Sequence, residues 1–535
     1  MAERVAQWLI DRDFGQATPV MILSGNSIEH ALMTLGCLTA NVPAVPISPS
    51  FSLASQDHAR LLHCVREVRP QLVFAQSGTS YADALAAIGD ADGTIAVVTV
   101  DKAADGYAFA DVIAAATTDA VRARRASITP DGVAKILFTS GSTGMPKAVP
   151  QTHRMLTAVL AGLDGLRDEE PEPDVIPESL EWMPWSHIAA GNINFNGVLQ
   201  NGGILYLDEG RPLPGQFDAT IRNLREVSPI TFASAPIAFG LLADALEQDL
   251  DLRRSFFRNL RYMAYGGATL SNDIYDRLQA LAIAETGFRI PLTTMYGSTE
   301  TQGITMTHWA TERVGLIGLP MPGMTLKLVP NGDKLEVRVK GASVMPGYLG
   351  DNARGATAFD DEGFYQLGDA VTFVDPSNPS QGLAFDGRVA EDFKLDSGTW
   401  VSVGTLRPAL IAACSPYLQD AVITGHDRRW VGALLWPSAA AIETFKRKDG
   451  LDLVALAAAL GARLAAHNAS AGGSSRRIKR FVVMTQPLDP EAGEINDKGY
   501  VNQSAALRTR ADVVDRLYQT PLAAGVMSLP AVITG

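Results

Sequence analysis

The sequence predicts an α/β protein in which a large N-terminal region, built from several subdomains with parallel-rich sheets, precedes a small α+β C-terminal domain. Short apolar runs alternate with amphipathic helical patterns, which is typical of parallel sheets flanked by helices. The chain has 535 residues, too many for a single core when a domain holds about 150. Hydrophobic residues make up 47% and charged residues 19%, a balance that suits a well-buried globule.

The alternation begins near the N-terminus, where residues 18–26 predict a strand, 28–40 a helix and 42–48 a second strand. The same kind of apolar run predicts further strands at 71–76, 94–100, 202–208, 230–236 and 261–267. Helical patterns separate these runs, so the strands are expected to lie parallel. Strand ends that carry Gly, Ser or Thr are natural ligand positions in such sheets.

A change of pattern marks the C-terminal domain. The segment DPSNPSQG, 375–382, has the composition of a loop at a domain junction. We therefore divide the chain into residues 1–386 and 387–535. The second part has its own predicted elements: strands at 420–426, 431–437 and 480–486, an Ala-rich helix at 453–467, and a Gly/Ser loop at 469–475.

Charge and cysteine content narrow the classes of function. A formal net charge of −13 argues against a nucleic-acid or anionic-membrane partner, although local amides and a few cations can still hold a small anion. Cys37, Cys64 and Cys414 are odd in number and lack metal-ligand spacing, which argues against a disulfide framework or a zinc site. Because no apolar run approaches the roughly 18 residues of a membrane span, we expect a cytoplasmic protein.

The most informative segment is ILFTSGSTGMPKAVPQTH, 136–153, in which an apolar strand leads into a Gly-rich loop and then Lys147. Backbone N–H groups and hydroxyls in such a loop can wrap phosphate oxygens, and a helix is predicted to start near Thr152. The spacing differs from the GxxxxGK[ST] phosphate loop. Composition alone leaves an ordinary surface turn equally open. The candidate phosphate-binding residues are Thr139, Ser140, Gly141, Ser142, Thr143, Gly144 and Lys147.

A second segment, TTMYGSTETQG, 293–303, also follows an apolar stretch. The ring of Tyr296, next to Gly297, can lie on a purine face, and Thr299 can bond a phosphate. Glu300 is a candidate ligand for Mg²⁺, which prefers oxygen donors. In isolation, a glutamate such as Glu300 is more often a carboxylate at the start of a helix, where it is favourable in any case.

Together these segments resemble two signature motifs of the adenylate-forming superfamily, which includes acyl-CoA synthetases, carrier-loading adenylation domains and luciferases. Further motifs follow in the order of that family: YGGATL at 265–270, EVRVKGASVMPGY at 336–348, GFYQLGD at 363–369 and DGR at 386–388. The resemblance extends from residue 18 to residue 505. It implies a mobile small domain that rotates about the DGR segment between two half-reactions.

The resemblance also implies a nucleotide site. The segment from Thr139 to Lys147 would hold the β- and γ-phosphates of ATP, and Thr299 and Glu300 would serve the α-phosphate and Mg²⁺. The adenine would lie between two glycines and an aromatic ring, and the ribose hydroxyls would bond a carboxylate supported by an arginine. The residues in these positions are Gly266, Gly267, Tyr296, Asp369 and Arg388.

Three further residues take roles implied by the resemblance. In most relatives the C-terminal catalytic lysine follows a glycine, whereas here Glu494 takes that place and Lys498 is the nearest lysine. This spacing is similar to that of feruloyl-CoA synthases and long-chain acyl-CoA synthetases, and we assign Lys498. Lys394 resembles the lysine that the rotated small domain presents in the second half-reaction. His187 would line the acid pocket where it meets the thiol tunnel.

The segments 181–195 and 201–212 are most similar to those of feruloyl-CoA synthases, and the small residues Ala189, Ala190 and Gly191 suggest room for a planar ring. The implied function is an ATP-dependent acid:CoA ligase for ferulic or a related hydroxycinnamic acid, with CoA as second substrate, in hydroxycinnamate catabolism. The expected partners are therefore small molecules, and the chain is expected to be a monomer or homodimer. A fatty or other aryl acyl-CoA ligase, a carrier-loading adenylation enzyme and a regulator without catalysis remain open.

Overall fold

The computed structural model forms two compact units, residues 1–327 with 338–366 and residues 328–337 with 367–535. The division runs through strands β15 (Met324–Asn331), β16 (Lys334–Gly341) and β17 (Tyr365–Phe373). The boundary expected between residues 386 and 387 lies inside the second unit and stays a prediction. The structure describes residues 1–530 apart from 56, 102–105, 140–144, 168–174, 213–214, 267–269, 310, 312–313, 333, 351–356, 390, 449, 490–491 and 496–500.

The first unit opens with a sheet in the order β5-β4-β3-β1-β2-β6-β7. Neighbouring strands are parallel except β6 and β7, which form an antiparallel hairpin. The strands are β1 (Val20–Leu23), β2 (Ala44–Ile47), β3 (Leu72–Ala75), β4 (Ala96–Thr99), β5 (Tyr107–Ala108), β6 (Val133–Thr139) and β7 (Lys147–Thr152). The α/β prediction with parallel-rich sheets is therefore confirmed.

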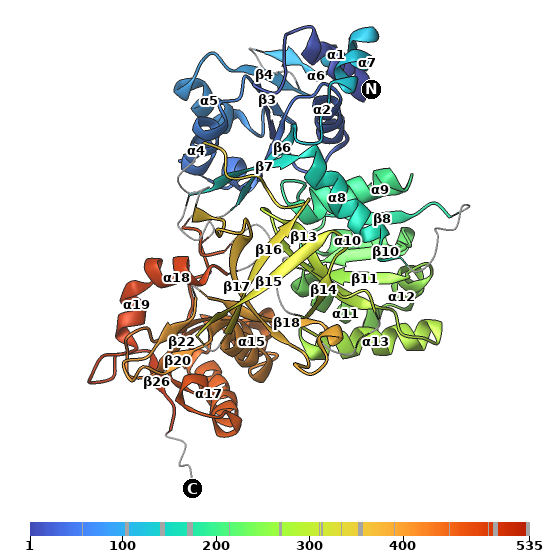
Figure 1. Ribbon diagram of the computed structural model, residues 1–535. Coiled ribbons are helices and arrows are strands. Elements are labelled where there is room, and N and C mark those ends of the chain that lie inside the picture. Colours follow the sequence, from blue (N-terminus) through green and yellow to red (C-terminus); the bar gives the residue numbers. More distant parts are fainter. Residues whose placement is uncertain are drawn as a thin grey trace. The chain divides into compact units, whose positions relative to one another are not determined.

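Helices cover both faces of this sheet (Figure 1). Alternation within β1 explains why: Val20 and Ile22 pack with α1 and α2, whereas Met21 and Leu23 pack with α4 and α5. Both sets are fully buried. The helices are α1 (Ala2–Ile10), α2 (Ile28–Thr39), α3 (Ser50–Leu53), α4 (Ala59–Val68), α5 (Ala82–Ala91), α6 (Phe109–Val112) and α7 (Asp119–Ala126).

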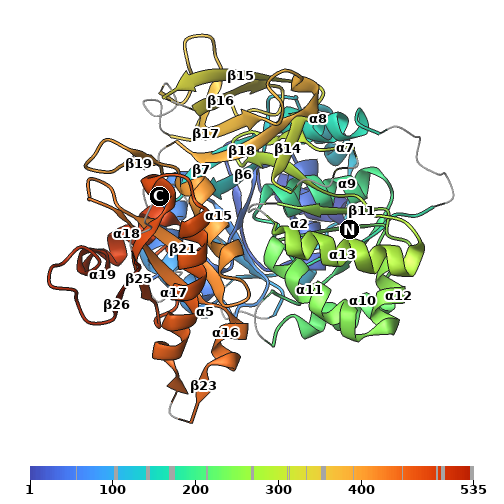
Figure 2. The same cartoon turned by 90° about the horizontal axis from the view of Figure 1, so that it is seen from below.

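The rest of the first unit is built on the strand order β10-β11-β12-β13-β14, in which β10, β11 and β12 are parallel. Its strands are β8 (Glu178–Glu181), β9 (Ile204–Leu207), β10 (Thr231–Ser234), β11 (Tyr262–Tyr265), β12 (Leu292–Ser298), β13 (Gln302–Met306) and β14 (Leu316–Pro320). Its helices are α8 (His153–Asp164), the π-helix η1 (Ile188–Asn194), α9 (Phe195–Gln200), α10 (Asp218–Glu226), α11 (Pro236–Gln248), α12 (Leu250–Phe257) and α13 (Asn272–Thr286). Figures 1 and 2 show α11 and α13 side by side. The apolar core that these helices help to form is rich in phenylalanine.

The second unit contains the sheet β21-β22-β25-β26, with one apolar core on each face. The strands that follow β17 are β18 (Leu383–Arg388), β19 (Phe393–Lys394), β20 (Trp400–Val401), β21 (Leu418–Thr424), β22 (Val431–Pro437), β23 (Lys446–Arg447), β24 (Gly450–Leu451), β25 (Ile478–Val483) and β26 (Val526–Ser528). Its helices are η2 (Pro379–Gln381), α15 (Val403–Ala413), α16 (Ala439–Thr444), α17 (Leu453–Ser470), η3 (Ser474–Arg476), α18 (Gln503–Thr509) and α19 (Ala511–Arg516). The predicted strands and the Ala-rich helix are present.

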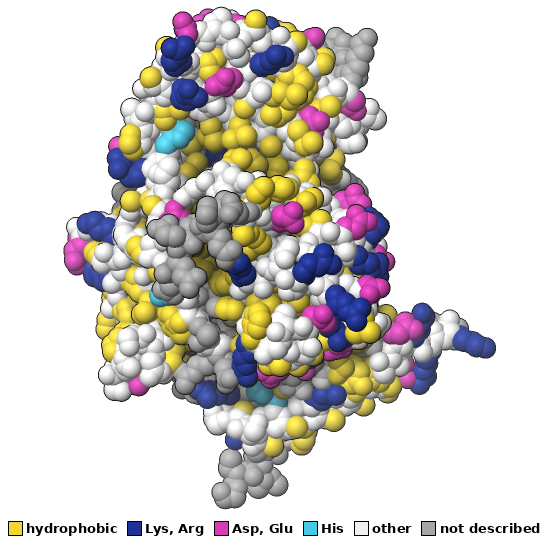
Figure 3. Space-filling model, turned by 90° about the vertical axis from the view of Figure 1, so that its right-hand side faces the viewer, with side chains coloured by type: hydrophobic (Ala, Val, Ile, Leu, Met, Phe, Trp, Pro, Cys, Tyr) yellow, Lys and Arg dark blue, Asp and Glu magenta, His cyan; other side chains and the backbone are white. Residues whose placement is uncertain are grey.

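On the side that Figure 3 shows, Lys and Arg side chains are interspersed with Asp and Glu and with apolar side chains. No helix among the described residues is both long and apolar enough to cross a bilayer.

Candidate functional site

The β6–β7 hairpin positions the ends of the predicted phosphate loop. Thr139 at the end of β6 pairs directly with Lys147 at the start of β7. The sequence placed a helix near Thr152, and Thr152 indeed caps α8 by accepting a hydrogen bond from the Met155 N–H at 3.2 Å. Between loop and helix lies a strand that the sequence analysis did not predict. The residues Ser140, Gly141, Ser142, Thr143 and Gly144 lie outside the described residues.

The adenine-side candidates lie at the carboxyl ends of adjacent parallel strands, which is where α/β sheets bind ligands. Gly266 directly follows β11, and Tyr296 lies near the end of the neighbouring β12. A Cβ atom added to Gly266 would meet no heavy atom of the described residues within 4 Å. Protein packing therefore does not require glycine there, and the space fits the close approach of a ligand. Gly267 lies outside the described residues.

The β12–β13 hairpin carries Thr299 and Glu300 in its turn. Gly297 has a packing role in this hairpin, because a Cβ atom there would lie 1.8 Å from the carbonyl oxygen of Gln302. No side chain fits at that distance. The backbone geometry alone thus explains Gly297, and its part in nucleotide binding stays a prediction.

Tyr348 joins the two predicted motifs. Its hydroxyl donates to Glu300 Oε1 at 2.9 Å, and Lys147 Nζ lies 5.0 Å from the centroid of its ring. Burial and then the nearby Glu300 carboxylate raise the pKa of Tyr348 above its usual value, so the phenol keeps its proton and remains a donor. The backbone N–H of Met345 donates to the Glu300 carbonyl oxygen at 2.7 Å and fixes the turn. Tyr348 ends the motif at 336–348, and the sequence predicted no role for this residue.

Glu300 was predicted to bind Mg²⁺. Among the described residues there is no group of three or more His, Cys, Asp or Glu side chains that could hold a metal ion. A single carboxylate is still a suitable donor, because Mg²⁺ commonly takes one or two protein carboxylates and completes its shell with phosphate oxygens and water. The turn therefore fits an ion that arrives with a triphosphate.

His187 stands at the start of the π-helix η1, and its N–H donates to the Pro184 carbonyl oxygen at 3.0 Å. Asn26 holds the preceding loop from two sides: its Nδ2 donates to the Met183 carbonyl oxygen at 2.9 Å, and its Oδ1 accepts from the Trp185 N–H at 3.1 Å. A π-helix is rare and often marks a functional site. The segment is thus held in a defined, uncommon backbone conformation.

The small residues of η1 have a different explanation from the one the sequence suggested. Ala190 is fully buried in an apolar cluster with Trp185 and Phe195. A Cβ atom on Gly191 would lie 2.1 Å from the Trp185 carbonyl oxygen. Internal packing requires both residues to be small, so they are not evidence of room for a planar ring.

In the second unit the structure brings the two predicted ribose-side residues together. Asp369 on β17 and Arg388 on β18 are directly paired across the two strands, with 3.6 Å between Arg388 Nε and Asp369 Oδ1. The side chain of Asp369 is 14% exposed and that of Arg388 58%. The ion pair orients the carboxylate.

The second unit contains two lysines with predicted catalytic roles, of which the structure describes Lys394. Lys394 on β19 is exposed, and its ammonium lies 4.9 Å from the ring centroid of Trp400 on β20. Lys498 lies outside the described residues, but Ile495 and Val501 on either side of its segment form an antiparallel bridge. The predicted roles of both lysines are untested.

Glu494 anchors the start of that bridged segment. It is 1% exposed, and Arg510 donates to both of its carboxylate oxygens, each at 2.7 Å. Thr509 donates to the same carboxylate, and the N–H of Asp489 donates to Oε2 at 2.8 Å. These bonds tie Glu494 to the end of α18 and to the residue that follows it.

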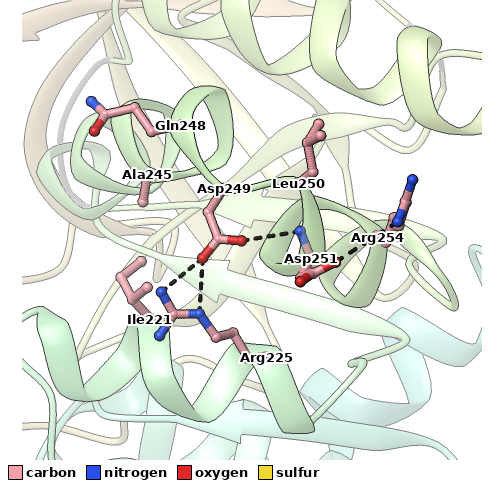
Figure 4. A pocket seen from close by; sticks show the side chains of 8 residues that line it. All are labelled: Ile221, Arg225, Ala245, Gln248, Asp249, Leu250, Asp251 and Arg254. Atoms are coloured by element: carbon pink, nitrogen blue, oxygen red, sulfur yellow. Dashed lines mark hydrogen bonds and ion pairs between the residues drawn. The ribbon is translucent and has the colours of Figure 1, made fainter.

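A surface depression between α10, α11 and α12 is lined by none of these residues (Figure 4). Its floor is occupied by an ion pair, in which Arg225 contacts Asp249 Oδ2 at 2.7 Å. Asp249 also caps α12 by accepting from the N–H groups of Asp251 and Leu252. Arg225 and Asp249 thus already have partners within the protein, so they are not candidates for binding or catalysis.

A comparison with known proteins shows to which family the chain belongs. A family model described as AMP-binding enzyme matches residues 1–349, which is more than half of the chain. The chain belongs to this family. A model of the AMP-binding enzyme C-terminal domain also matches residues 405–521.

Individual relatives are distant. A carboxylic acid reductase from Mycobacterium marinum is 26% identical over 95% of this chain, and one from Segniliparus rugosus is 26% identical over 77%. The chain spans only 44% and 34% of the length of these two reductases. A 3-[(3aS,4S,7aS)-7a-methyl-1,5-dioxo-octahydro-1H-inden-4-yl]propanoyl:CoA ligase from Rhodococcus jostii is 24% identical, with 69% of each chain covered.

Solved structures show the same fold. The adenylation domain of a carboxylate reductase from Mycobacterium chelonae has a TM-score of 0.73 at 22% identity, covering 97% of this chain and 83% of that one. ATP-bound MatB from Rhodopseudomonas palustris has a TM-score of 0.72 at 21% identity, covering 96% and 92%. The adenylate-forming fold, with a large N-terminal and a smaller C-terminal domain, is thereby confirmed.

Proposed function

We propose that this protein activates a carboxylic acid with ATP and transfers the acyl group to the thiol of CoA. The observation that carries the proposal is the convergence of Lys147 and Glu300 on Tyr348. A cation from one predicted motif and a carboxylate from another meet on one side chain, beside strand ends suited to a nucleotide. Family membership supports the same chemistry.

In the first half-reaction a carboxylate oxygen of the acid bonds to the α-phosphorus of ATP. The bond from that phosphorus to the bridging oxygen breaks, and pyrophosphate leaves with the electron pair. Two anions must approach, so Lys147 and Lys498 would offset their charge. Glu300, oriented by Tyr348, would hold Mg²⁺, which when bound neutralises phosphate oxygens.

In the second half-reaction the sulfur of CoA bonds to the acyl carbon of the adenylate. The bond from that carbon to the phosphate oxygen breaks, AMP leaves, and the thiol proton passes to solvent. No protein nucleophile is needed, because AMP is a good leaving group. Lys394 would serve this step, since it resembles the lysine that relatives present after rotation of the small domain.

For the acid we propose ferulic acid or a related hydroxycinnamic acid. The support is the resemblance of the segments 181–195 and 201–212 to feruloyl-CoA synthases, with His187 as a wall of the acid pocket. A cytoplasmic location and a monomer or homodimer belong to the same proposal. Fatty and other aryl acids are the competing substrates.

A carrier protein is the competing acceptor. The similarity to carboxylic acid reductases over 95% of this chain favours this alternative as a specific candidate. In that case the adenylate would be formed as described, and the acyl group would pass to a carrier thiol instead of CoA.

The test is thioester formation with MgATP and CoA across ferulic, p-coumaric, caffeic, cinnamic, benzoic and palmitic acids, with AMP and pyrophosphate followed in parallel. Selective turnover of the hydroxycinnamic acids would support the proposal in full. Selective turnover of palmitic acid would show that the substrate is a fatty acid and not a hydroxycinnamic acid. Pyrophosphate release that depends on the acid but yields no CoA thioester would move the acceptor to a carrier protein. No acid-dependent pyrophosphate release with any acid would overturn the function.

A further inference from the structure

Lys135 is a buried cation that none of the predicted roles uses. It lies on β6, four residues before Thr139, and only 2% of it is exposed. Its ammonium donates to the Gly191 carbonyl oxygen at 2.7 Å and to Asn192 Oδ1 at 3.1 Å. Both acceptors belong to the π-helix η1 that follows His187.

The burial of Lys135 calls for a reason, because lysine is almost never fully buried. Burial lowers the pKa of Lys135 to about 7. No ion pair compensates its charge among the residues that the structure describes. The two hydrogen bonds to η1 are therefore the polar interactions that the buried Lys135 ammonium makes.

A chain of buried amides continues from Lys135 toward the Thr299 turn. Asn192 Nδ2 donates to Gln151 Oε1 at 3.2 Å and to Gln302 Oε1 at 3.4 Å. Gln302 donates to the same Gln151 oxygen, and Gln151 Nε2 donates to the Thr299 carbonyl oxygen at 2.9 Å. Asn192, Gln151 and Gln302 are all fully buried. Partners of such a network constrain one another, because an unpaired buried amide is costly.

A second buried group holds the far end of η1. Glu181 on β8 accepts a hydrogen bond from Asn194 Nδ2 and another from the Met183 N–H at 2.7 Å. The π-helix is thus held by Lys135 near its middle and by Glu181 at its end. A cavity with room for one water molecule adjoins Lys135 on the side of His30, Thr34 and Trp185.

We propose that Lys135 is a positioning residue for the carboxylic acid substrate: it fixes the π-helix behind His187 and, through Asn192, Gln151 and Gln302, sets that helix relative to the Thr299 turn. The inference rests on the proposed function, which makes His187, the residue directly before η1, a wall of the acid pocket. Lys135 touches neither acid nor nucleotide, so it acts through η1.

The central test compares Lys135→Met with the wild type in steady-state kinetics. The substitution replaces the unbranched side chain by one that is a single heavy atom shorter and apolar, and it leaves the Gly191 oxygen and Asn192 Oδ1 without their donors. We expect the KM for the acid to rise about tenfold or more, while the KM for ATP changes by less than about twofold. Lys135→Gln, which retains one donor group, should recover part of the loss.

The matched control is Gln279→Met. Gln279 is 4% exposed on α13, and its Nε2 donates to the Ile290 carbonyl oxygen at 2.8 Å, so the substitution also removes a buried hydrogen bond of the same unit. It should lower stability without changing the KM for the acid. If Gln279→Met raised that KM equally, the effect of Lys135→Met would be explained by lost stability alone, and the proposal would be overturned.

Two further measurements keep the inference testable. Asn192→Leu leaves Lys135 in place but breaks the bridge to Gln151, and it should raise the KM for the acid in the same way even if Lys135→Met does not fold. Hydrogen exchange of peptides covering 186–196 should accelerate about fivefold or more in Lys135→Met, and not in Gln279→Met. An unchanged KM for the acid in both network variants, or unchanged exchange, would refute the positioning role.

Failure of the proposed function gives a different pattern. If the wild type releases no pyrophosphate with any acid, the ligase proposal falls, whatever the exchange data show. If the wild type is active and the network variants keep its KM for the acid, only the role of Lys135 falls.

Discussion

Replacing Tyr348 with phenylalanine removes one hydroxyl from the point where two motifs meet. The ring that faces Lys147 at 5.0 Å remains, whereas the 2.9 Å hydrogen bond to Glu300 is lost. Hydrogen bonds to charged groups contribute about 1.5–3 kcal/mol. Because about 1.4 kcal/mol corresponds to a tenfold change in rate, we expect kcat/KM for adenylate formation to fall by about 10- to 100-fold.

The assay is pyrophosphate release at a series of Mg²⁺ concentrations. If Tyr348 acts by orienting Glu300 for the metal, excess Mg²⁺ should restore part of the rate. Tyr206→Phe is the control, since the Tyr206 hydroxyl contacts Glu178 Oε1 at 3.3 Å in the same unit but belongs to neither of the two motifs that meet at Tyr348. A Tyr348→Phe enzyme that matches the Tyr206→Phe enzyme in rate and Mg²⁺ dependence would refute the reasoning.

Three other outcomes are expected. Burial raises the pKa of Glu181 from 4.5 to about 7. Between these two pH values the folded state keeps a proton on Glu181 that the unfolded state releases. The stability that this proton contributes to the folded state is full below pH 4.5 and is lost as the pH rises to 7. Glu181→Gln should therefore gain up to about 3 kcal/mol of unfolding free energy relative to wild type over that range, measured by denaturant titration at each pH. Glu494→Gln should lower the unfolding free energy by about 3 kcal/mol, because it leaves the Arg510 guanidinium without its buried partner; an unchanged denaturation midpoint would contradict this. Lys498→Ala should abolish acid-dependent pyrophosphate release yet leave ATP binding measurable by calorimetry, and a near-wild-type rate would show that Lys498 is wrongly assigned.

Much of the architecture was predictable from the sequence, because it depends on neighbouring residues. The alternation of apolar runs predicted β1, β2 and α2 closely. Thr152 signalled the start of α8 through its own hydroxyl, which caps the helix. The segment of the Thr299 turn and the pairing partners Asp369 and Arg388 were likewise found from motifs in the chain, whereas the phosphate loop stays a prediction.

Tertiary structure decided what these residues do to one another. Tyr348 lies 48 residues from Glu300 in the sequence, so no local pattern could pair them. Gly191 and Ala190 looked like empty pocket space, yet packing against Trp185 requires their size.

Lys135 shows the same limit most clearly. In the sequence it is one polar residue in an apolar strand, and strand periodicity says only which face it occupies. Its hydrogen bonds to Gly191 and Asn192 join residues 56 and 57 positions apart. The sequence by itself therefore determined elements such as β1, β2, α2 and the start of α8, whose conformations depend on local periodicity and capping. Only folding determined the buried contacts between them, because each arises where separate elements pack and exclude water.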